Sequence, residues 1–290
     1  MGVTATNLTV MALDVGGTKL AAGLVDQTGD LTQRGAVPTP AQQGPEVMWE
    51  AVTALLDPLA GPRVAGLGVG VGGPMLLGGA AVSPLNIAAW RDFPLRDRLR
   101  ERYGAAVAID NDAKALALGE GRWGAAVGVD NYLAMVVSTG VGGGIVLNGR
   151  LLDGLAGNAG HIGHVIVEPD GRPCACGATG CLEAEVSGSA IARFTGAPPS
   201  EAPSEVRRRT GRLVGRAVAS VANLLDLQLA LVAGSVALGF GDEFFEAAQA
   251  EVDRSALLDF SRGTRIVAAG LRDRGPLLGA AAVGFAHLGV

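Results

Sequence analysis

The stretch that decides the fold reads TVMALDVGGTKLAAGLVD and runs from Thr9 to Asp26. A β-rich run, Thr9 to Leu13, ends at Asp14 and is followed by a turn that contains two glycines. A second apolar run extends from Leu20 to Val25 and ends in the next turn. Apolar runs of this length between glycine-rich turns are typical of paired strands. The stretch therefore predicts a meander of strand, glycine turn and strand.

The same plan recurs in the second half of the chain. Tyr132 to Val137 leads into a turn of sequence STGVGGG (138–144), which is followed by Ile145 to Leu147 and an Asn-Gly turn. Helical and extended patterns alternate after each meander, which indicates an α/β fold built from one unit used twice. The expected helices are 47–59, 95–103, 214–225, 244–252 and 276–288, and the expected strands are 64–71, 107–109, 229–232 and 266–268.

Two lobes are expected from this duplication. Residues 1–120 form the smaller N-terminal lobe, joined by the C-terminal helix at about 276–290, and residues 121–275 form the larger lobe. The glycine-punctuated segment Gly119–Gly128 is the predicted hinge, and the Pro- and Ser-rich stretch Gly196–Ser204 is the predicted surface loop. We expect ligands to bind between the lobes.

Composition argues against several functions. The 290-residue chain has a net charge of -5 and a pI near 5.3, so it lacks the basic footprint of a nucleic-acid-binding protein. The arginine run at 207–209 precedes an apolar helix and is read as a solvated face. Met1 to Val10 lacks the pattern of an export signal, and no run of about eighteen apolar residues occurs, so we expect a cytoplasmic protein without membrane contact.

The glycine turns have two interpretations. Such a turn after a buried strand directs several backbone N–H groups at one point and so suits an anion such as phosphate. It can equally be a tight hairpin with no ligand. The chain contains no Gly-x-x-x-x-Gly-Lys-Ser/Thr motif, and the turn after Val137 leads into a strand, which argues against P-loop and dinucleotide-binding folds. A third turn, Ala233-Gly234-Ser235, is a weaker signal.

The cysteines indicate a metal site. All three lie in the run CACGATGC (174–181), and His161 and His164 lie just upstream. An odd count disfavours disulfides, whereas three thiolates and one imidazole complete the tetrahedral shell of a structural zinc ion. The alternative is three free cysteines.

A carboxylate follows the strand predicted at 107–109, in the sequence AIDNDAKA (108–115). Asn111 or Asp112 suits the N-cap of the helix that follows.

These motifs resemble those of the ROK family of bacterial sugar kinases and related repressors. The segments DVGGTK (14–19), STGVGGG (138–144) and VAGSV (232–236) look like the two phosphate motifs and the adenosine motif of actin- and hexokinase-like ATPases, and the likeness extends from Val10 to Leu288. The resemblance implies a two-lobed α/β fold with an interlobe cleft that binds ATP with Mg²⁺. It also implies that Asp14 holds Mg²⁺. The residues that it places in contact with ATP and its phosphates are Asp14, Gly16, Gly17, Thr18, Lys19, Thr139, Gly140, Gly142 and Gly234.

The resemblance also assigns the sugar side. It makes Asp112 the catalytic base and Asn111 a sugar contact, and it makes His164 the zinc ligand beside Cys174, Cys176 and Cys181. His164 and Glu183 are expected to contact sugar as well, with Asn86 as a further contact. His161 departs from the family, which usually has glutamate there, so we expect it to change the choice of sugar. The alternative is that His161 packs behind His164 and that Glu183 alone recognises the substrate.

The expected function is ATP-dependent phosphorylation of a hydroxyl, the 6-OH, of a hexose or amino sugar. A kinase for a cyclitol or other polyol, or an idle sugar-binding protein, are the alternatives. Because the first phosphate motif begins at Asp14, too early for the DNA-binding region of the family's repressors to precede it, we expect the chain not to be a DNA-binding regulator. The family resemblance implies a homodimer or homotetramer.

Overall fold

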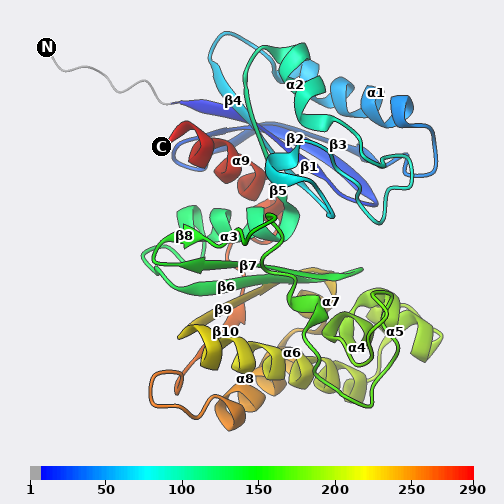
Figure 1. Ribbon diagram of the computed structural model, residues 1–290, viewed down its shortest axis with the longest axis vertical. Helices are drawn as coiled ribbons and strands as arrows, with labels where there is room; N and C mark the ends of the chain where they lie inside the picture. The colour runs from blue at the N-terminus through cyan, green and yellow to red at the C-terminus, as the bar shows by residue number, and fades with distance from the viewer. Residues whose placement is uncertain (1–7) are drawn as a thin grey trace, which may run out of the picture. The chain divides into compact units, whose positions relative to one another are not determined.

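The computed structural model describes residues 8–290 and divides the chain into two compact units (Figure 1). The expectations for Met1 to Asn7, which concern the export signal and the start of the first lobe, lie outside the described residues. The first unit comprises the chain up to Gly124 together with Asp153–Asn158 and Asp273–Val290, and the second comprises Ala125–Leu152 and Ala159–Arg272. Within residues 8–290, no helix is both long enough and apolar enough to cross a bilayer.

The first unit contains a mixed sheet of order β3-β2-β1-β4-β5. The antiparallel meander β1–β2–β3 is followed by two strands that run parallel to β1. Their apolar residues are buried in the core, whereas β3 is a mostly exposed edge strand. The strands are β1 (Thr9–Val15), β2 (Lys19–Asp26), β3 (Leu31–Pro38), β4 (Val64–Val71) and β5 (Ala106–Asn111).

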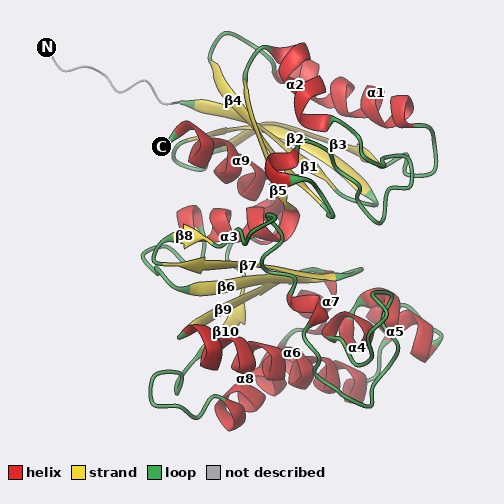
Figure 2. Ribbon diagram, viewed as in Figure 1, coloured by secondary structure: helices red, strands yellow, loops and turns green. Residues whose placement is uncertain are grey.

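Helices cover both faces of this sheet (Figure 2). The helices α3 and α9 pack against each other on one face, and α1 and α2 lie on the other. Small residues of α9 are buried against β1, β4 and β5, so this C-terminal helix completes the first unit's core. The helices are α1 (Pro45–Leu56), α2 (Leu95–Tyr103), α3 (Asp112–Trp123) and α9 (Gly275–Leu288), with 3₁₀ turns at Asp57–Leu59, Leu77–Gly79 and Arg272–Arg274.

The second unit repeats the topology. Its sheet order, β8-β7-β6-β9-β10, is that of the first unit once β6, β7 and β8 are equated with β1, β2 and β3. The meander is again antiparallel, and β9 and β10 again run parallel to its first strand. The duplicated α/β fold expected from the sequence is confirmed. The strands are β6 (Tyr132–Val137), β7 (Val141–Leu147), β8 (Arg150–Leu151), β9 (Leu229–Ala233) and β10 (Arg265–Ala268).

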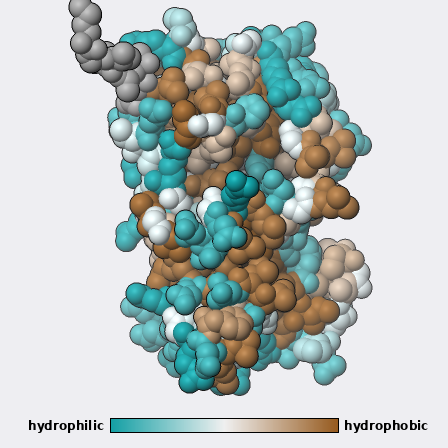
Figure 3. Space-filling view, turned by 60° about the vertical axis from the view of Figure 1, so that its left-hand side comes forward, coloured by the Kyte–Doolittle hydropathy of each residue, from teal (hydrophilic) through white to brown (hydrophobic). Residues whose placement is uncertain are grey.

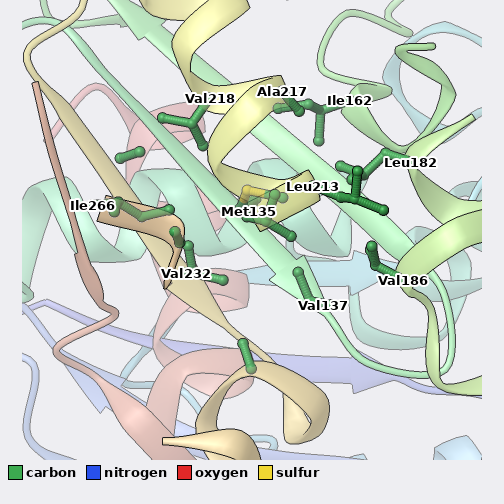
Figure 4. Close-up of a cluster of buried hydrophobic side chains, with 14 of the residues drawn as sticks. Met135, Val137, Ile162, Leu182, Val186, Leu213, Ala217, Val218, Val232 and Ile266 are labelled. Atoms are coloured by element: carbon green, nitrogen blue, oxygen red, sulfur yellow. The ribbon is translucent and has the colours of Figure 1, made fainter. Parts of the chain in front are cut away.

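The core of the second unit lies between its sheet and helix α6 (Figure 4). Met135, Val232 and Ile266 from the strands pack with Leu213 and Val218 from α6. Residues that flank the cysteine run, including Ile162, Leu182 and Val186, join the same cluster. The helices are α4 (Leu182–Val186), α5 (Gly188–Thr195), α6 (Ser204–Leu225), α7 (Ser235–Phe240) and α8 (Asp242–Ser255), with 3₁₀ turns at Ile162–His164 and Pro199–Glu201.

Some local predictions differ from the structure. Gly119 to Trp123 belong to α3, so the first half of the predicted hinge is helical. The predicted surface loop contains a 3₁₀ turn, and α6 begins at Ser204, ten residues before the predicted start at Val214. The arginines of 207–209 lie within this first part of α6, where charged residues share the helix with a buried apolar face.

Apolar residues also reach the surface. On the face shown in Figure 3, hydrophobic areas in each unit are interrupted by hydrophilic residues. In the first unit, Leu76, Leu77, Leu85 and Leu155 have large exposed side chains and lie outside the α-helices and strands. The segments around them carry or adjoin candidate site residues.

Candidate functional site

In the first unit, the candidate residues gather at the carboxyl ends of three adjacent parallel strands. Asp14 lies opposite Gly70 of β4, which in turn lies opposite Asp110 of β5. Asn111 is the last residue of β5, and Asp112 is the first of α3. Carboxyl ends of parallel strands are the edge at which open α/β sheets bind ligands.

Asp14 and Asp112 face the same point. A Cβ on Gly70 would stand 3.9 Å from Asp14 Oδ1 and 3.7 Å from the Cα of Asp112, so both residues border this position of β4. Burial and, to a smaller extent, the charge of Asp112 together raise the pKa of Asp14 to about 7, although Lys19 opposes the shift. A half-buried carboxyl group, that of Asp14, beside the exposed carboxyl group of Asp112 at the same sheet edge is suited to a cation.

Asn111 caps α3. Its Oδ1 accepts hydrogen bonds from the backbone N–H groups of Ala113, at 3.0 Å, and Lys114, at 3.4 Å. The N-cap interpretation is therefore correct for Asn111. The cap holds the side-chain oxygen and directs the amide Nδ2 toward the turn after β4, where a Cβ on Gly73 would lie 3.7 Å from it. The cap thus orients a hydrogen-bond donor at the strand ends.

The first glycine turn is a tight hairpin. The Gly16 N–H donates to the carbonyl oxygen of Lys19 at 3.1 Å, and Thr39 binds this turn through two further hydrogen bonds, to the carbonyls of Gly16 and Thr18. The side chains of Thr18 and Lys19 are exposed. The hairpin interpretation of the backbone is correct, and it is compatible with phosphate binding because the tip remains accessible.

The loop that carries Asn86 packs on this turn. A Cβ on Gly17 would stand only 2.8 Å from the Cβ of Asn86, so glycine is required for the close approach. Arg91 fastens the loop, because its Nη1 donates to the carbonyl oxygens of Pro84, Ile87 and Trp90. This role of Arg91 is not visible in the sequence, because an exposed arginine in a loop carries no pattern that points to its partners.

In the second unit, the other two glycine turns lie side by side. Gly234 has a φ of 101°, and a Cβ there would stand 2.3 Å from the carbonyl oxygen of Val137, the residue before the second phosphate turn. The hydroxyls of Ser138 and Ser235 are 3.0 Å apart. The predicted second phosphate motif and adenosine motif therefore meet.

Glu183 binds the second phosphate turn. Its Oε2 accepts a hydrogen bond from the Val141 N–H at 2.9 Å and would lie 2.9 Å from a Cβ on Gly140. One N–H of this turn is thus satisfied by protein, whereas the Thr139 side chain is exposed. Gly142, which follows Val141, lies opposite Val136 in the pairing of β6 with β7. Glu183 was predicted as a sugar contact, and its contact with the turn was not foreseen.

The cysteines and His164 converge. The ligand atoms of His164, Cys174, Cys176 and Cys181 all lie within 4.8 Å of one another. His164 Nδ1 is 3.8 Å from Cys174 Sγ, and the sulfurs of Cys176 and Cys181 are 3.7 Å apart. Sulfurs bound to one zinc at about 2.3 Å in a tetrahedron would be separated by about this distance. The four residues fit zinc, with Nδ1 as the imidazole ligand and Nε2 directed away from the sulfurs.

The loop that carries Cys174, Cys176 and Cys181 shifts the pKa values of two of its thiols in opposite directions. A backbone hydrogen bond from Ala178 and the neighbouring thiols lower the pKa of Cys176 to about 7, whereas burial raises the pKa of Cys181 to about 12. A bound cation deprotonates a thiol outright, so the second shift does not oppose metal binding.

His161 is exposed. Its ring centroid lies 6.1 Å from that of His164, with an angle of 28° between the planes. The ring is therefore not enclosed behind His164, as the alternative interpretation required. Both histidines belong to the segment around the 3₁₀ turn Ile162–His164, which contacts β7 and α4.

Glu185, which the sequence does not single out, anchors the cysteine loop, the segment from Arg172 to Cys181. Its side chain is fully buried and pairs with the guanidinium groups of Arg172 and Arg209, which outweigh the opposing effect of burial and lower its pKa. Arg172 belongs to the loop before Cys174, and Arg209 belongs to α6. The ion pairs fix the loop to the core.

A cavity of about 220 Å³ lies in the first unit beside α3. Lys114 and Asp110 form part of its wall together with Asp153. The sequence analysis missed these residues, although Lys114 is one of two lysines in the chain and follows Asp112 by two positions. Its remaining lining residues are Met75, Leu76, Leu77, Gly78, Ile109, Ala156 and Gly157.

The chain belongs to the ROK family, whose model matches residues 10–285. It is 37% identical over 253 residues to an N-acetylmannosamine kinase of Escherichia fergusonii, an overlap that covers 81% of this chain and 85% of that protein. An N-acetylmannosamine kinase of Shigella flexneri is 38% identical over 254 residues, with the same coverage.

Solved structures agree with this assignment. A ROK family glucokinase from Streptomyces griseus, crystallised with glucose and AMPPNP, superposes with a TM-score of 0.83 at 30% identity and covers 96% of this chain and 99% of its own. A ROK hexokinase from Thermus thermophilus gives a TM-score of 0.82 at 33% identity, with 97% and 99% covered. The fold of the chain is therefore that of the hexokinase-like ATPases.

Proposed function

We propose that this chain transfers the γ-phosphoryl group of ATP to the 6-OH of a hexose or amino sugar, with Asp112 as the catalytic base. The chain is a sugar kinase of the ROK family, and relatives at 37–38% identity act on N-acetylmannosamine. The observation that carries the proposal is that Asp112 and Asp14 both border Gly70 of β4, the strand that lies between β1 and β5.

In the first unit, Asp112 would accept the hydrogen bond of the sugar hydroxyl and take its proton as the new P–O bond forms. The Nδ2 of Asn111, oriented by the cap, would donate to a sugar oxygen, and Asn86 would supply a further contact. Phosphoryl transfer depends mainly on such alignment and on neutralising charge.

Phosphate binding is proposed for both glycine turns. In the first, the backbone at Gly16 and Gly17 and the side chains of Thr18 and Lys19 would contact phosphate oxygens. Asp14 would hold Mg²⁺, which supplies charge neutralisation to the transferred group. In the second unit, the turn Thr139–Gly142 would contact phosphate, and Gly234 would lie against adenosine.

Sugar recognition is proposed for the segment that carries His161 and His164, together with Glu183. With Nδ1 on zinc, His164 would use Nε2 toward a sugar hydroxyl. A neutral imidazole at position 161 offers one donor and one acceptor, whereas glutamate would accept two hydrogen bonds. The exposed ring suits a sugar that presents an acceptor, such as the carbonyl oxygen of an N-acetyl group.

Zinc would be structural and bound by His164, Cys174, Cys176 and Cys181. Thiolates in this number require a reducing compartment, so we propose the cytoplasm as the place of action. We also propose a homodimer or homotetramer, which light scattering of the purified protein would test.

The test is a panel of sugars and phosphoryl donors with wild type and Asp112→Asn. We expect wild type to form ADP with N-acetylmannosamine in preference to glucose, and the variant to bind the sugar but not to turn over. Turnover only with a cyclitol would favour the polyol alternative. Sugar binding without turnover in wild type would overturn the kinase proposal.

A further inference from the structure

Lys114 is an unusual lysine, because its side chain is buried and its ammonium group contacts two carboxylates and a backbone carbonyl. Its side chain is 4% exposed, lies 3.0 Å from Asp110 and 2.7 Å from Asp153, and also donates to the carbonyl oxygen of Gly157 at 3.3 Å. Burial alone would lower the pKa of this lysine, but Asp153 and Asp110 outweigh it and raise the pKa. Lys114 is therefore a charged group with partners on two different parts of the chain.

One partner, Asp110, belongs to β5, the strand that leads directly to the proposed base Asp112. Asp110 lies at the end of β5, and its Oδ1 also accepts a hydrogen bond from the Asn111 N–H at 2.7 Å. Burial raises the pKa of Asp110, which Lys114 opposes. Lys114 itself lies in the first turn of α3, two residues after Asp112. Its ammonium is thus fixed to the same short stretch that holds the proposed base.

The other partners belong to the segment Asp153–Asn158. This segment belongs to the first unit, although the residues on both sides of it belong to the second. Three residues after its end comes His161. Two hydrogen bonds from Lys114 connect the segment to the rest of the first unit.

Little else holds the segment in place. The cavity of about 220 Å³ lies between it and β5, and the Leu155 side chain is completely exposed. Gly157 approaches Leu77, which is itself mostly exposed. With so little apolar burial, the segment's position depends on the two bonds from Lys114.

We propose that Lys114 is a positioning residue that clamps the Asp153–Asn158 segment to the start of α3, and that this clamp sets the affinity for the sugar. The inference rests on the proposed function, because Asn111 and His161, on the two sides of the clamp, are proposed sugar contacts. Loosening the segment would free the chain that leads to His161, and the sugar would then have to order it on binding.

The test uses Asp153→Ala, because Asp153 is 63% exposed and its removal leaves the buried pair of Lys114 and Asp110 intact. Lys114→Met removes the clamp from the other side, and Lys114→Arg preserves the charge. The matched control is Asp57→Ala, which removes an exposed carboxylate 2.6 Å from Arg102 in the same unit. Asp57 has no proposed role in binding or catalysis.

In ligand-free protein, we expect hydrogen exchange of the amides in 153–160 to become faster in Asp153→Ala and Lys114→Met, and to remain unchanged in Asp57→Ala. The KM for the sugar should rise about tenfold in Asp153→Ala, the effect of losing one charge-assisted hydrogen bond. The KM for ATP should stay within about twofold, a separation that a general loss of structure would not give. Lys114→Arg should recover most of the sugar affinity.

Unchanged exchange in both Asp153→Ala and Lys114→Met would overturn the inference, whether or not wild type phosphorylates a sugar. Faster exchange with an unchanged KM, or unchanged calorimetric affinity, for the sugar would also overturn it. Failure of the proposed function is seen separately, as the absence of phosphorylation by wild type.

Discussion

Replacing Asp14 with asparagine should stabilise the ligand-free protein while it abolishes phosphoryl transfer. The pKa of Asp14 is raised from 3.8 to about 7 by burial and by the charge of Asp112. A raised pKa means that the folded chain holds this proton more tightly than the unfolded chain does. The folded state therefore loses stability as the pH rises from about 4 to about 7, and asparagine removes that loss.

The size of the effect follows from the shift. About three pKa units at about 1.4 kcal/mol each give an upper bound of about 4 kcal/mol above pH 7. Because Asp14 is partly exposed, solvent relaxation reduces this cost, and we expect about 1–3 kcal/mol. In a chain of 290 residues that corresponds to a rise in Tm of about 2–5 °C at pH 8. At pH 4.5 the difference should fall to about half of that value.

Tryptophan fluorescence is the suitable assay, because Trp49, Trp90 and Trp123 all lie in the first unit with Asp14. Thermal unfolding of wild type and Asp14→Asn is followed from pH 4.5 to 8.5. Asp57→Asn is the control: Arg102 lowers the pKa of Asp57, so this change should destabilise by at most about 1 kcal/mol. Lower stability of Asp14→Asn at pH 8, or a difference independent of pH, would refute the reasoning.

Three further predictions concern the proposed roles. Asp112→Asn should lower kcat by several powers of ten with little change in sugar affinity, and near-normal turnover would contradict its role as base. Protein never exposed to added zinc should contain about one zinc ion per chain by elemental analysis, and Cys176→Ser should lose metal, stability and sugar affinity together; fully active protein without zinc would refute the site. His161→Glu should raise kcat/KM for glucose about ten- to a hundredfold, and no gain would show that His161 does not select the sugar.

The sequence predicted those elements in which local pattern and burial agree. The strand Val64–Val71 is buried along most of its length and was predicted with the observed bounds. The edge strand β3 was missed, because its residues are mostly exposed and show no alternation. The short helices α5 and α7 were also missed, since eight and six residues carry too little periodicity to separate a helix from a loop.

The candidate site was predictable where several metal-ligating residues lie close together in the sequence. Cys174, Cys176 and Cys181 lie within eight residues, and the structure brings them together with His164. Lys114 and Asp153 are 39 positions apart, and nothing in either local sequence links them. Such a pair becomes visible only when the fold returns the chain from the second unit to the first.

Glu183 explains why two motifs that are distant in the sequence depend on each other. It follows Cys181 by two residues at the start of α4, and its carboxylate accepts the N–H of Val141 in the second glycine turn. Because zinc would hold Cys181, and Glu185 holds α4 through two arginines, the carboxylate of Glu183 is fixed from both sides. A metal that contacts no phosphate would in this way help to set the backbone geometry on which phosphate binding depends.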